Sequence, residues 1–186
     1  MRIYTRKGDD GTTGLYYGGR TAKDAPLVDA YGTVDEAQAF LGLARADAER
    51  GSELDELLVA IERDLWVLMA DLATGEDNRH KLVAGQSLVT DEMVAGLEAH
   101  IDALTERSEP PTEFVVPGQS RAGALLDVAR TVVRRAERRS VGTAAPGSLA
   151  VIYLNRLSDL LWTMARWQEG ESLPARSNRP ARPKGS

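Results

Sequence analysis

The chain has 186 residues, which is enough for one domain with a proper hydrophobic core and too few for two domains of ordinary size. Hydrophobic residues make up 42% and charged residues 27%, as in an ordinary folded protein. Cysteine is absent, which excludes disulfides, thiolate metal sites and a cysteine nucleophile. The first residues lack the apolar run of a signal peptide, and no later stretch approaches membrane-spanning length. We therefore expect a cytoplasmic protein that does not bind membranes.

Charge is divided unevenly along the chain. The net charge is −5, but residues 25–120 carry 20 acidic and 6 basic side chains, whereas the rest carries 8 acidic and 17 basic ones. This separation predicts that the ends and the C-terminal half meet a polyanion. The acidic middle argues against a long nucleic-acid track, so we expect no nucleic-acid partner and favour a nucleotide triphosphate.

The first 25 residues are expected to form a loop. The segment GDDGTTGLYYGG has five glycines within twelve positions, which is too many for the interior of a helix. The segment around Thr5–Gly14, followed by Lys23, combines backbone N–H groups, the hydroxyls of Thr12 and Thr13, and the cations Arg6 and Lys7. Such a loop can bind phosphate. It matches neither a Walker A loop nor the dinucleotide fingerprint, and most glycine-rich loops bind nothing.

Five helices follow in the predicted order, and their apolar residues recur at bundle spacing. Pro26 suits a first helical turn, and Thr90 and Asp91 can cap the third helix. We do not expect a strand in FVVPG. The predicted fold is all-α, an antiparallel five-helix bundle of the ferritin-like or four-helix type with a glycine-rich N-terminal loop. The predicted helices span residues 26–50, 53–73, 90–107, 120–141 and 146–169.

The domain organisation follows from these elements. Residues 1–25 are expected to be a nucleotide-binding loop within the single domain, and residues 26–170 to be the bundle. The tail, residues 171–186, is rich in Pro and Arg and is expected to be flexible.

The fourth predicted helix carries an arginine cluster in ARTVVRRAERR. At about 100° per residue, Arg130, Arg134 and Glu137 lie within roughly 60° of one another, beside the apolar stripe. Arg135, Arg138 and Arg139 point elsewhere. Most charge runs are solvated surfaces, and an i,i+3 Arg–Glu pair fits that interpretation. Arginines that border the core also suit a phosphate or a buried carboxylate, because the guanidinium presents a planar fork of donors.

Two further polar positions sit beside apolar ones. Asn155 and Asp159 share a face of the fifth helix, where they can simply join two helices by hydrogen bonds. Asp35 lies within an apolar segment and needs a cationic partner if it is buried. His80 and His100 stand alone and are interpreted as structural or surface residues. No metal-ligand spacing is visible, so the direct ligands of any metal are left open.

Together these segments resemble the PduO-type ATP:cob(I)alamin adenosyltransferases. The likeness lies in TRKGDDGTTGLYYGGRTAKD, AYGTVDEAQAFLG, FVVPG, ARTVVRRAERR and YLNRLSDLLWTMAR, in that order, and extends to about Gln168. The resemblance implies a homotrimer of five-helix bundles that binds ATP, with Mg²⁺, between adjacent subunits. It also implies adenosyl transfer from ATP to the cobalt of reduced cobalamin, with triphosphate released. A reductase and an acceptor enzyme are further implied partners. One departure is Gln119, where the family usually has glycine.

The resemblance also implies roles for individual residues. Asp35 would pair with Arg130 across the subunit interface, and Phe114 would pack against the corrin and help to remove the lower axial ligand of cobalt. Arg134 would act in catalysis as well as in ATP binding, and Asp159 would support the site. The ATP-binding residues would be Thr5, Arg6, Lys7, Gly8, Thr12, Thr13 and Lys23 from one subunit and Arg134, Arg135, Glu137, Arg138 and Asn155 from its neighbour.

Two other functions remain open from the sequence. A corrinoid escort would need the corrin pocket without turnover. A nucleotide-triphosphate sensor or hydrolase would need the loop and the arginines, but no apolar pocket at Phe114.

Overall fold

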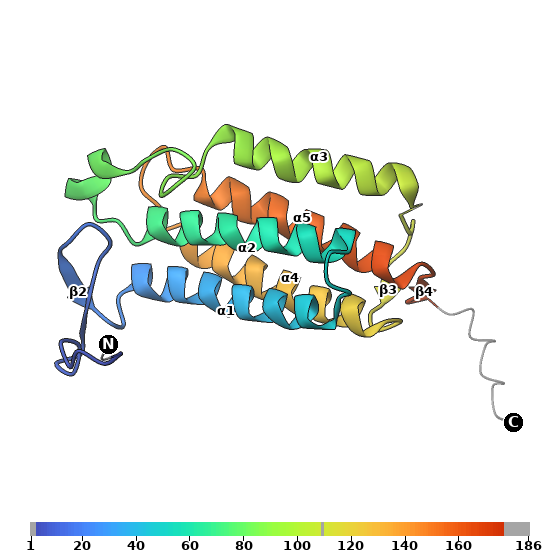
Figure 1. Cartoon of the computed structure of the whole chain (residues 1–186), viewed down its shortest axis with the longest axis horizontal. Helices are drawn as coiled ribbons and strands as arrows, with labels where there is room; N and C mark the ends of the chain where they lie inside the picture. Colours follow the sequence, from blue (N-terminus) through green and yellow to red (C-terminus); the bar gives the residue numbers. More distant parts are fainter. Residues whose placement is uncertain (1–2, 109, 177–186) are drawn as a thin grey trace, which may run out of the picture.

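Five α-helices run up and down along the long axis of the molecule in the computed structural model, which describes residues 3–108 and 110–176 (Figure 1). Each helix is antiparallel to the one before it. The prediction of an all-α antiparallel bundle is therefore confirmed. The helices are α1 (Pro26–Asp47), α2 (Glu53–Leu72), α3 (Asp91–Arg107), α4 (Arg121–Ser140) and α5 (Ala150–Glu169).

The helix ends follow local capping signals. Pro26 is the first residue of α1, as expected from its fixed φ and missing N–H. The side chains of Ser52, Thr90 and Ser120 accept hydrogen bonds from backbone N–H groups in the first turns of α2, α3 and α4. The first and second helices end earlier than predicted, at Asp47 and Leu72, and the fifth begins later, at Ala150. Element ends depend on capping geometry, which periodicity does not specify.

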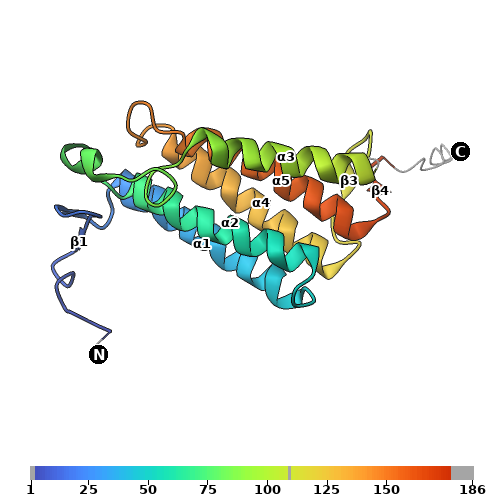
Figure 2. The same cartoon turned by 45° about the horizontal axis from the view of Figure 1, so that its top comes forward.

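The core lies where α4 packs against both α1 and α5. Helix α1 contributes small residues at heptad spacing, Ala30, Ala37 and Ala44, all fully buried. Small side chains at these positions let the backbones of α1 and α4 approach closely. Helix α3 packs along α5, on the side of the bundle away from α1 (Figure 2). The apolar stripe predicted for α2 is buried throughout: Leu54, Leu57, Leu58, Ile61, Leu65, Leu68, Met69 and Leu72.

The N-terminal segment is not entirely a loop, which corrects the prediction. Strands β1 (Thr12–Gly14) and β2 (Arg20–Ala22) pair antiparallel as a small hairpin. A short 3₁₀ helix, η1 (Glu76–Lys81), lies in the segment between α2 and α3, where no element was predicted. The hairpin connection uses Gly18 and Gly19, with φ of 107° and 91°, a conformation that favours glycine. The high glycine content thus marks turns between short strands.

A second correction concerns FVVPG and the tail. Strand β3 (Val115–Val116) pairs antiparallel with β4 (Leu173–Pro174). Part of the tail that was expected to be flexible is therefore paired, and residues 177–186 lie outside the described residues. Each strand has only two residues, so neither carries a recognisable period of its own. The pairing depends on the return of α5 to the end of the bundle where α4 begins.

Candidate functional site

The residues predicted to form the site gather at opposite ends of the bundle. The hairpin lies at the end where α1 starts and α4 finishes, and β3 and β4 lie at the other end (Figure 1). Between the two ends, Asp127 and Glu137 of α4 accept hydrogen bonds from Arg166 and Asn155 of α5. The sequence could predict both groups of residues but not this separation.

The glycine-rich loop is arranged by its own side chains. The Thr12 hydroxyl donates to Asp10 Oδ1 at 2.8 Å and accepts from Arg20 Nε at 3.0 Å. The hydrogen bonds that Asp10 accepts from the hydroxyl and from the backbone N–H of Thr12 lower the pKa of its carboxyl. A Cβ added to Gly8 would lie 3.0 Å from the Thr12 carbonyl oxygen and 3.2 Å from Lys23 Nζ, so glycine allows the lysine to lie against the loop backbone. Sequence reasoning missed Arg20, which fixes the shape of this loop.

The remaining cations of the loop face solvent. Thr5, Arg6 and Lys7 are all exposed, and Arg6 has a left-handed backbone with φ of 60°. The Lys7 N–H donates to Thr5 Oγ1 at 3.4 Å. Thr13 lies within hydrogen-bonding range of Tyr31, whose hydroxyl pKa is raised by burial. These exposed donors and charges can bind an anion that approaches from outside the chain.

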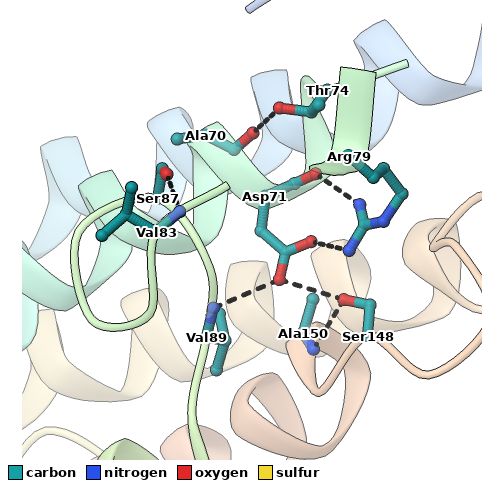
Figure 3. Close-up of polar contacts among 9 residues, drawn as sticks. All are labelled: Ala70, Asp71, Thr74, Arg79, Val83, Ser87, Val89, Ser148 and Ala150. Atoms are coloured by element: carbon teal, nitrogen blue, oxygen red, sulfur yellow. Dashed lines mark hydrogen bonds and ion pairs between the residues drawn. The ribbon is translucent and has the colours of Figure 1, made fainter. Parts of the chain in front are cut away.

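The segment 71–89, from the end of α2 to the approach to α3, contacts the hairpin, and we call this segment the floor. It includes Asp71, a fully buried carboxylate at the end of α2 (Figure 3). The Asp71 Oδ1 accepts from Arg79 Nη2 at 2.8 Å, and the Asp71 Oδ2 accepts from Val89 N and Ser148 Oγ, each at 3.2 Å. Arg79 Nη1 also donates to the Asp71 carbonyl oxygen at 3.1 Å. One carboxylate therefore joins α2, η1, the approach to α3 and the turn before α5.

Three contacts connect this floor to the hairpin. Tyr16 N donates to Ala73 O at 2.9 Å, and Asn78 Nδ2 donates to Gly18 O at 3.3 Å. The hydroxyls of Tyr17 and Ser87 form a hydrogen bond with an oxygen–oxygen distance of 3.4 Å. Asp71 therefore helps to position the hairpin. Sequence reasoning missed it, because one aspartate near the end of a helix resembles an ordinary surface residue.

On α4, the predicted catalytic Arg130 has a partner within its own chain. Its Nε donates to Asp127 Oδ1 at 2.9 Å, and the other oxygen of Asp127 accepts from Arg166 Nη2 at 2.6 Å. The side chain of Arg166 is 5% exposed, whereas that of Arg130 is 28% exposed. Asp127 thus fixes the orientation of the Arg130 side chain, while part of the Arg130 guanidinium can still reach a ligand. Neither Asp127 nor Arg166 was among the predicted site residues.

The next turns of α4 hold the other predicted residues. Glu137 Oε1 accepts from Asn155 Nδ2 at 3.0 Å, and Glu137 Oε2 lies 3.9 Å from Arg134 Nη1. The side chain of Arg134 is 48% exposed, so this arginine is more open than its place beside the core stripe suggested. The structure brings Arg134, Glu137 and Asn155 together. Asp159, on the same face of α5, is exposed.

The other arginines of α4 point toward different surroundings, as predicted. Arg135 pairs with Glu36, and Arg139 Nε lies 2.8 Å from Asp29 Oδ2, both carboxylates being on α1. Arg138 is exposed. Lys23 and Arg139 share a hollow of about 600 Å³ near the start of α1. Of the predicted ATP-binding arginines, Arg135 therefore pairs with α1 of its own chain, whereas Arg138 faces solvent.

A pocket of about 720 Å³ opens at the other end of the bundle. Part of its lining is apolar and includes Val115, Pro117 and the aromatic ring of Trp162. The rest of the lining is charged, and Arg166 lies over the Trp162 ring at 5.9 Å from its centroid. Phe114 stands at the mouth, 88% exposed, which is unusual for a large apolar side chain and marks a binding surface. The charged lining residues are Glu113, Asp127, Arg130, Arg166 and Arg176.

Asp35 is exposed on α1, so the predicted pair with Arg130 does not form within the chain. Among the described residues no ion pair includes Asp35. It lines a hollow of about 460 Å³ together with Gln38 and Glu62, and burial raises the pKa of the Glu62 carboxyl. The pair across a subunit interface stays a prediction.

The loop around Gln119 clarifies the departure from the usual glycine. The backbone at position 118 has a φ of 104°, a conformation that favours glycine, whereas the backbone at Gln119 does not have a positive φ. Gln119 contributes its backbone N–H, which donates to Glu169 Oε1 at 3.1 Å. Among the described residues, its side chain makes no hydrogen bond. The substitution is therefore compatible with the loop.

Two further observations limit the kinds of site. Across residues 3–108 and 110–176, no cluster of three or more His, Asp or Glu side chains is arranged to hold a metal ion. None of the helices in that part of the chain is long and apolar enough to cross a membrane. His80 and His100 are both exposed, as expected.

Comparison with known proteins gives one consistent result. Residues 3–168 match the family model described as cobalamin adenosyltransferase. A corrinoid adenosyltransferase from Citrobacter freundii is 43% identical over 171 residues, covering 90% of this chain and 95% of that protein. The corrinoid adenosyltransferase of Mycobacterium tuberculosis is 43% identical over 173 residues, covering 89% of this chain and 87% of that protein.

Solved structures agree with the sequence matches. A phenylalanine-to-histidine variant of the PduO-type ATP:corrinoid adenosyltransferase from Lactobacillus reuteri, in complex with cobalamin and ATP, superposes with a TM-score of 0.84. It is 29% identical, and the alignment covers 94% of this chain and 97% of that chain. The fold and the sequence therefore point to the same family.

Proposed function

The chain belongs to the cobalamin adenosyltransferase family, and from this premise we propose that it transfers the 5′-deoxyadenosyl group of ATP to the cobalt of a reduced corrinoid. The products are adenosylcobalamin and inorganic triphosphate. In this step the electron pair of cob(I)alamin forms the cobalt–carbon bond, while the bond from C5′ to the triphosphate oxygen breaks. The leaving triphosphate takes the electron pair of that broken bond.

One observation carries the proposal: an exposed phenylalanine and a half-buried arginine face the same pocket. Phe114 presents an apolar ring to a broad flat ligand, and Arg130 supplies positive charge in the same lining. A macrocycle with an anionic co-substrate beside it needs both kinds of surface. A plain triphosphatase has no use for the exposed ring.

The residue types suit this chemistry because cobalt is itself the nucleophile. The protein needs only to position the reactants and to stabilise the departing negative charge. Guanidinium groups and backbone N–H groups do this well, because they bind phosphate oxygens without accepting protons. We propose that Thr5, Arg6, Lys7, Gly8, Thr12, Thr13 and Lys23 bind the polyphosphate together with Arg134, Arg135, Glu137, Arg138 and Asn155.

The separation of the two groups of residues supports a site shared between subunits. The hairpin and the Phe114 pocket lie at opposite ends of the bundle. Helix α1, with 22 residues, spans about 33 Å at 1.5 Å per residue, so a hairpin cannot reach the pocket of its own chain. We propose a homotrimer in which the hairpin of one subunit faces α4 and α5 of the next.

The surroundings of Asp35 fit such an interface. Gln38 Oε1 and Glu62 Oε1, which line the same hollow, are shielded from water and have no hydrogen-bond partner among the described residues. Buried polar atoms ordinarily find a partner. A donor from an adjacent subunit would supply one, and Arg130 of that subunit is our candidate partner for Asp35.

The proposal also includes Mg²⁺ and two partner enzymes. Mg²⁺ typically binds through substrate phosphates with one or two carboxylates. The described residues offer no ready-made metal cluster, so we assign no step to a protein-bound metal ion and place Mg²⁺ with ATP. We also propose that a separate reductase supplies electrons and that an acceptor enzyme receives the adenosylcobalamin.

The decisive experiment mixes the protein with ATP, Mg²⁺ and chemically reduced cobalamin. We expect the absorption spectrum of adenosylcobalamin to appear, with one triphosphate released for each corrinoid converted. ADP formed in step with adenosylcobalamin would contradict alkylation by ATP. Phosphate release with no change in the corrinoid spectrum would instead support the hydrolase, and tight corrinoid binding with no turnover would support the escort.

A further inference from the structure

Glu169, the last residue of α5, holds the loop that carries Phe114. Its Oε1 accepts hydrogen bonds from the backbone N–H groups of Gly118 and Gln119, both at 3.1 Å. The Glu169 side chain is completely buried although the loop that it holds is exposed. A buried carboxylate that accepts two backbone donors makes a strong, directional anchor.

Glu169 is itself held by a chain of charges that ends at Arg130. Its Oε2 lies 3.0 Å from Arg166 Nε, and Arg166 Nη2 donates to Asp127 Oδ2 at 2.6 Å. The other oxygen of Asp127 accepts from Arg130 Nε at 2.9 Å. The polar chain therefore joins the loop that carries Phe114 to Arg130, and both residues line the pocket.

Helix α4 leaves room for this anchor. A Cβ added to Gly123, in the first turn of α4, would lie 2.7 Å from Glu169 Cγ and 3.0 Å from its Oε1. Glycine at position 123 therefore lets the carboxylate sit against the start of the helix. The positive end of the helix dipole also favours a carboxylate at that place.

Phe114 depends on such anchors because its own ring is not packed. The ring is 88% exposed, and the described contacts of this residue are made by its backbone, whose carbonyl accepts from Ala175 N at 2.7 Å. The β3–β4 pairing fixes the loop on one side, and Glu169 fixes it on the other. Loss of either anchor would let the ring move away from the corrin face.

We propose that Glu169, held by Arg166, is a positioning residue that fixes the 114–119 loop so that Phe114 meets the corrin. This inference rests on the proposed function, because it concerns how Phe114 acts on cobalt. Phe114 is needed most when the enzyme starts from cob(II)alamin, whose lower ligand must be removed before reduction. Loss of the anchor should therefore lower the rate from cob(II)alamin more than the rate from cob(I)alamin.

The test uses Glu169→Ala, which removes the oxygen that accepts from Gly118 N and Gln119 N together with the partner of Arg166. We expect the ratio of the cob(II)alamin rate to the cob(I)alamin rate to fall by about tenfold or more, since a displacement of about 1 Å can cost that much. The KM for ATP should stay unchanged. Glu171→Ala, at an exposed carboxylate two residues away, is the matched control and should keep the ratio of the unaltered protein.

A second variant distinguishes loss of the Glu169 anchor from unfolding of the protein. Gly123→Ala leaves every charge in place but forces Glu169 to move, and it should lower the same ratio. The spectrum of protein-bound cob(II)alamin with ATP is an independent readout, and both variants should show less of the four-coordinate form.

Equal loss of both rates, or an unchanged ratio in the variants, would overturn the positioning role. Failure of the proposed function looks different, because the unaltered protein would then form no adenosylcobalamin even from cob(I)alamin.

Discussion

Single arginines of α4 differ according to the partners that they meet. Arg135 and Arg139 pair with carboxylates of α1, and Arg130 is held from behind by Asp127. Arg134 keeps almost half of its side chain exposed and lies near Glu137. Of these residues, Arg134 has the most freedom to meet a ligand, because its contact with Glu137 is loose at 3.9 Å, whereas an arginine already paired closely in its own chain must exchange one partner for another.

Phe114 provides the sharpest prediction for a single residue. We expect Phe114→Ala to retain ATP binding and to lose about tenfold or more of the rate from cob(II)alamin, which corresponds to about 1.4 kcal/mol. The ring is already 88% exposed, so its removal should leave the free energy of unfolding almost unchanged. Steady-state rates from cob(II)alamin and from pre-reduced cob(I)alamin are the measurement.

Much of the rate of Phe114→Ala should return with cob(I)alamin as the substrate. If both rates fall equally, Phe114 acts in general packing and its assignment to the lower ligand is wrong.

Asp71 predicts an effect on stability. Replacement by alanine leaves Arg79 without its ion-pair partner and Val89 N without an acceptor. Removal of one partner from a buried pair typically costs about 3–5 kcal/mol. We expect a loss near the lower end of that range, because the Arg79 side chain keeps 19% exposure. Chemical unfolding of Asp71→Ala measures the change.

A matched control for Asp71 is available on the surface. Asp47 pairs with Arg121, and these side chains are 32% and 80% exposed. Asp47→Ala should change the free energy of unfolding by about 0–1 kcal/mol, as is usual for exposed pairs. Equal losses in the two variants would show that the floor beneath the hairpin contributes nothing special.

Helices α2 and α5 are joined by one buried polar contact, which predicts a pH dependence. The Tyr153 hydroxyl donates to Asp64 Oδ2 at 3.0 Å, and the tyrosine is fully buried. Burial raises the pKa of the Asp64 carboxyl above its ordinary 3.8, although the hydrogen bond from Tyr153 partly opposes that change. The folded protein therefore binds this proton more tightly than the unfolded chain does.

The sign of the effect follows from proton linkage. The stabilising contribution of Asp64 is fully present below the unfolded pKa and is lost as the pH rises through the higher folded pKa. Asp64→Asn keeps an acceptor for Tyr153 and cannot ionise. The free energy of unfolding of Asp64→Asn, measured relative to that of the unaltered protein, should therefore increase as the pH rises from below 3.8 to neutrality. Urea unfolding across this range, with Tyr153→Phe for comparison, measures the difference. A difference that stays constant with pH would contradict the raised pKa.

The shared site yields a prediction for the whole molecule. If Asp35 meets Arg130 of a neighbour, Asp35→Asn and Arg130→Ala should each weaken ATP binding or turnover and also loosen the assembly. Breaking a buried pair typically costs about 3–5 kcal/mol. ATP that contacts two subunits should stabilise the oligomer by mass action. Sedimentation of each protein with and without ATP measures both effects. A fully active monomer at micromolar concentration would rule out the shared site.

The sequence by itself determined the bundle and its caps. Apolar residues at helical spacing specify which face of α2 is buried, and Thr90 and Ser120 provide local signals for the starts of α3 and α4. These signals act within a few residues, so they can be recognised without a structure. The motifs of the N-terminal loop and of α4 also sufficed for the family resemblance, which the comparisons confirm.

Only the tertiary structure decided how distant segments meet. The β3–β4 pairing, the buried Asp71 and the chain from Arg130 to Glu169 all join residues that are far apart in sequence or on different elements. A carboxylate at position 71 or 169 looks like any surface residue until folding surrounds it with backbone donors. The physical reason is that burial and hydrogen-bond partners come from the packing of whole helices, whereas periodicity and capping are properties of one segment alone.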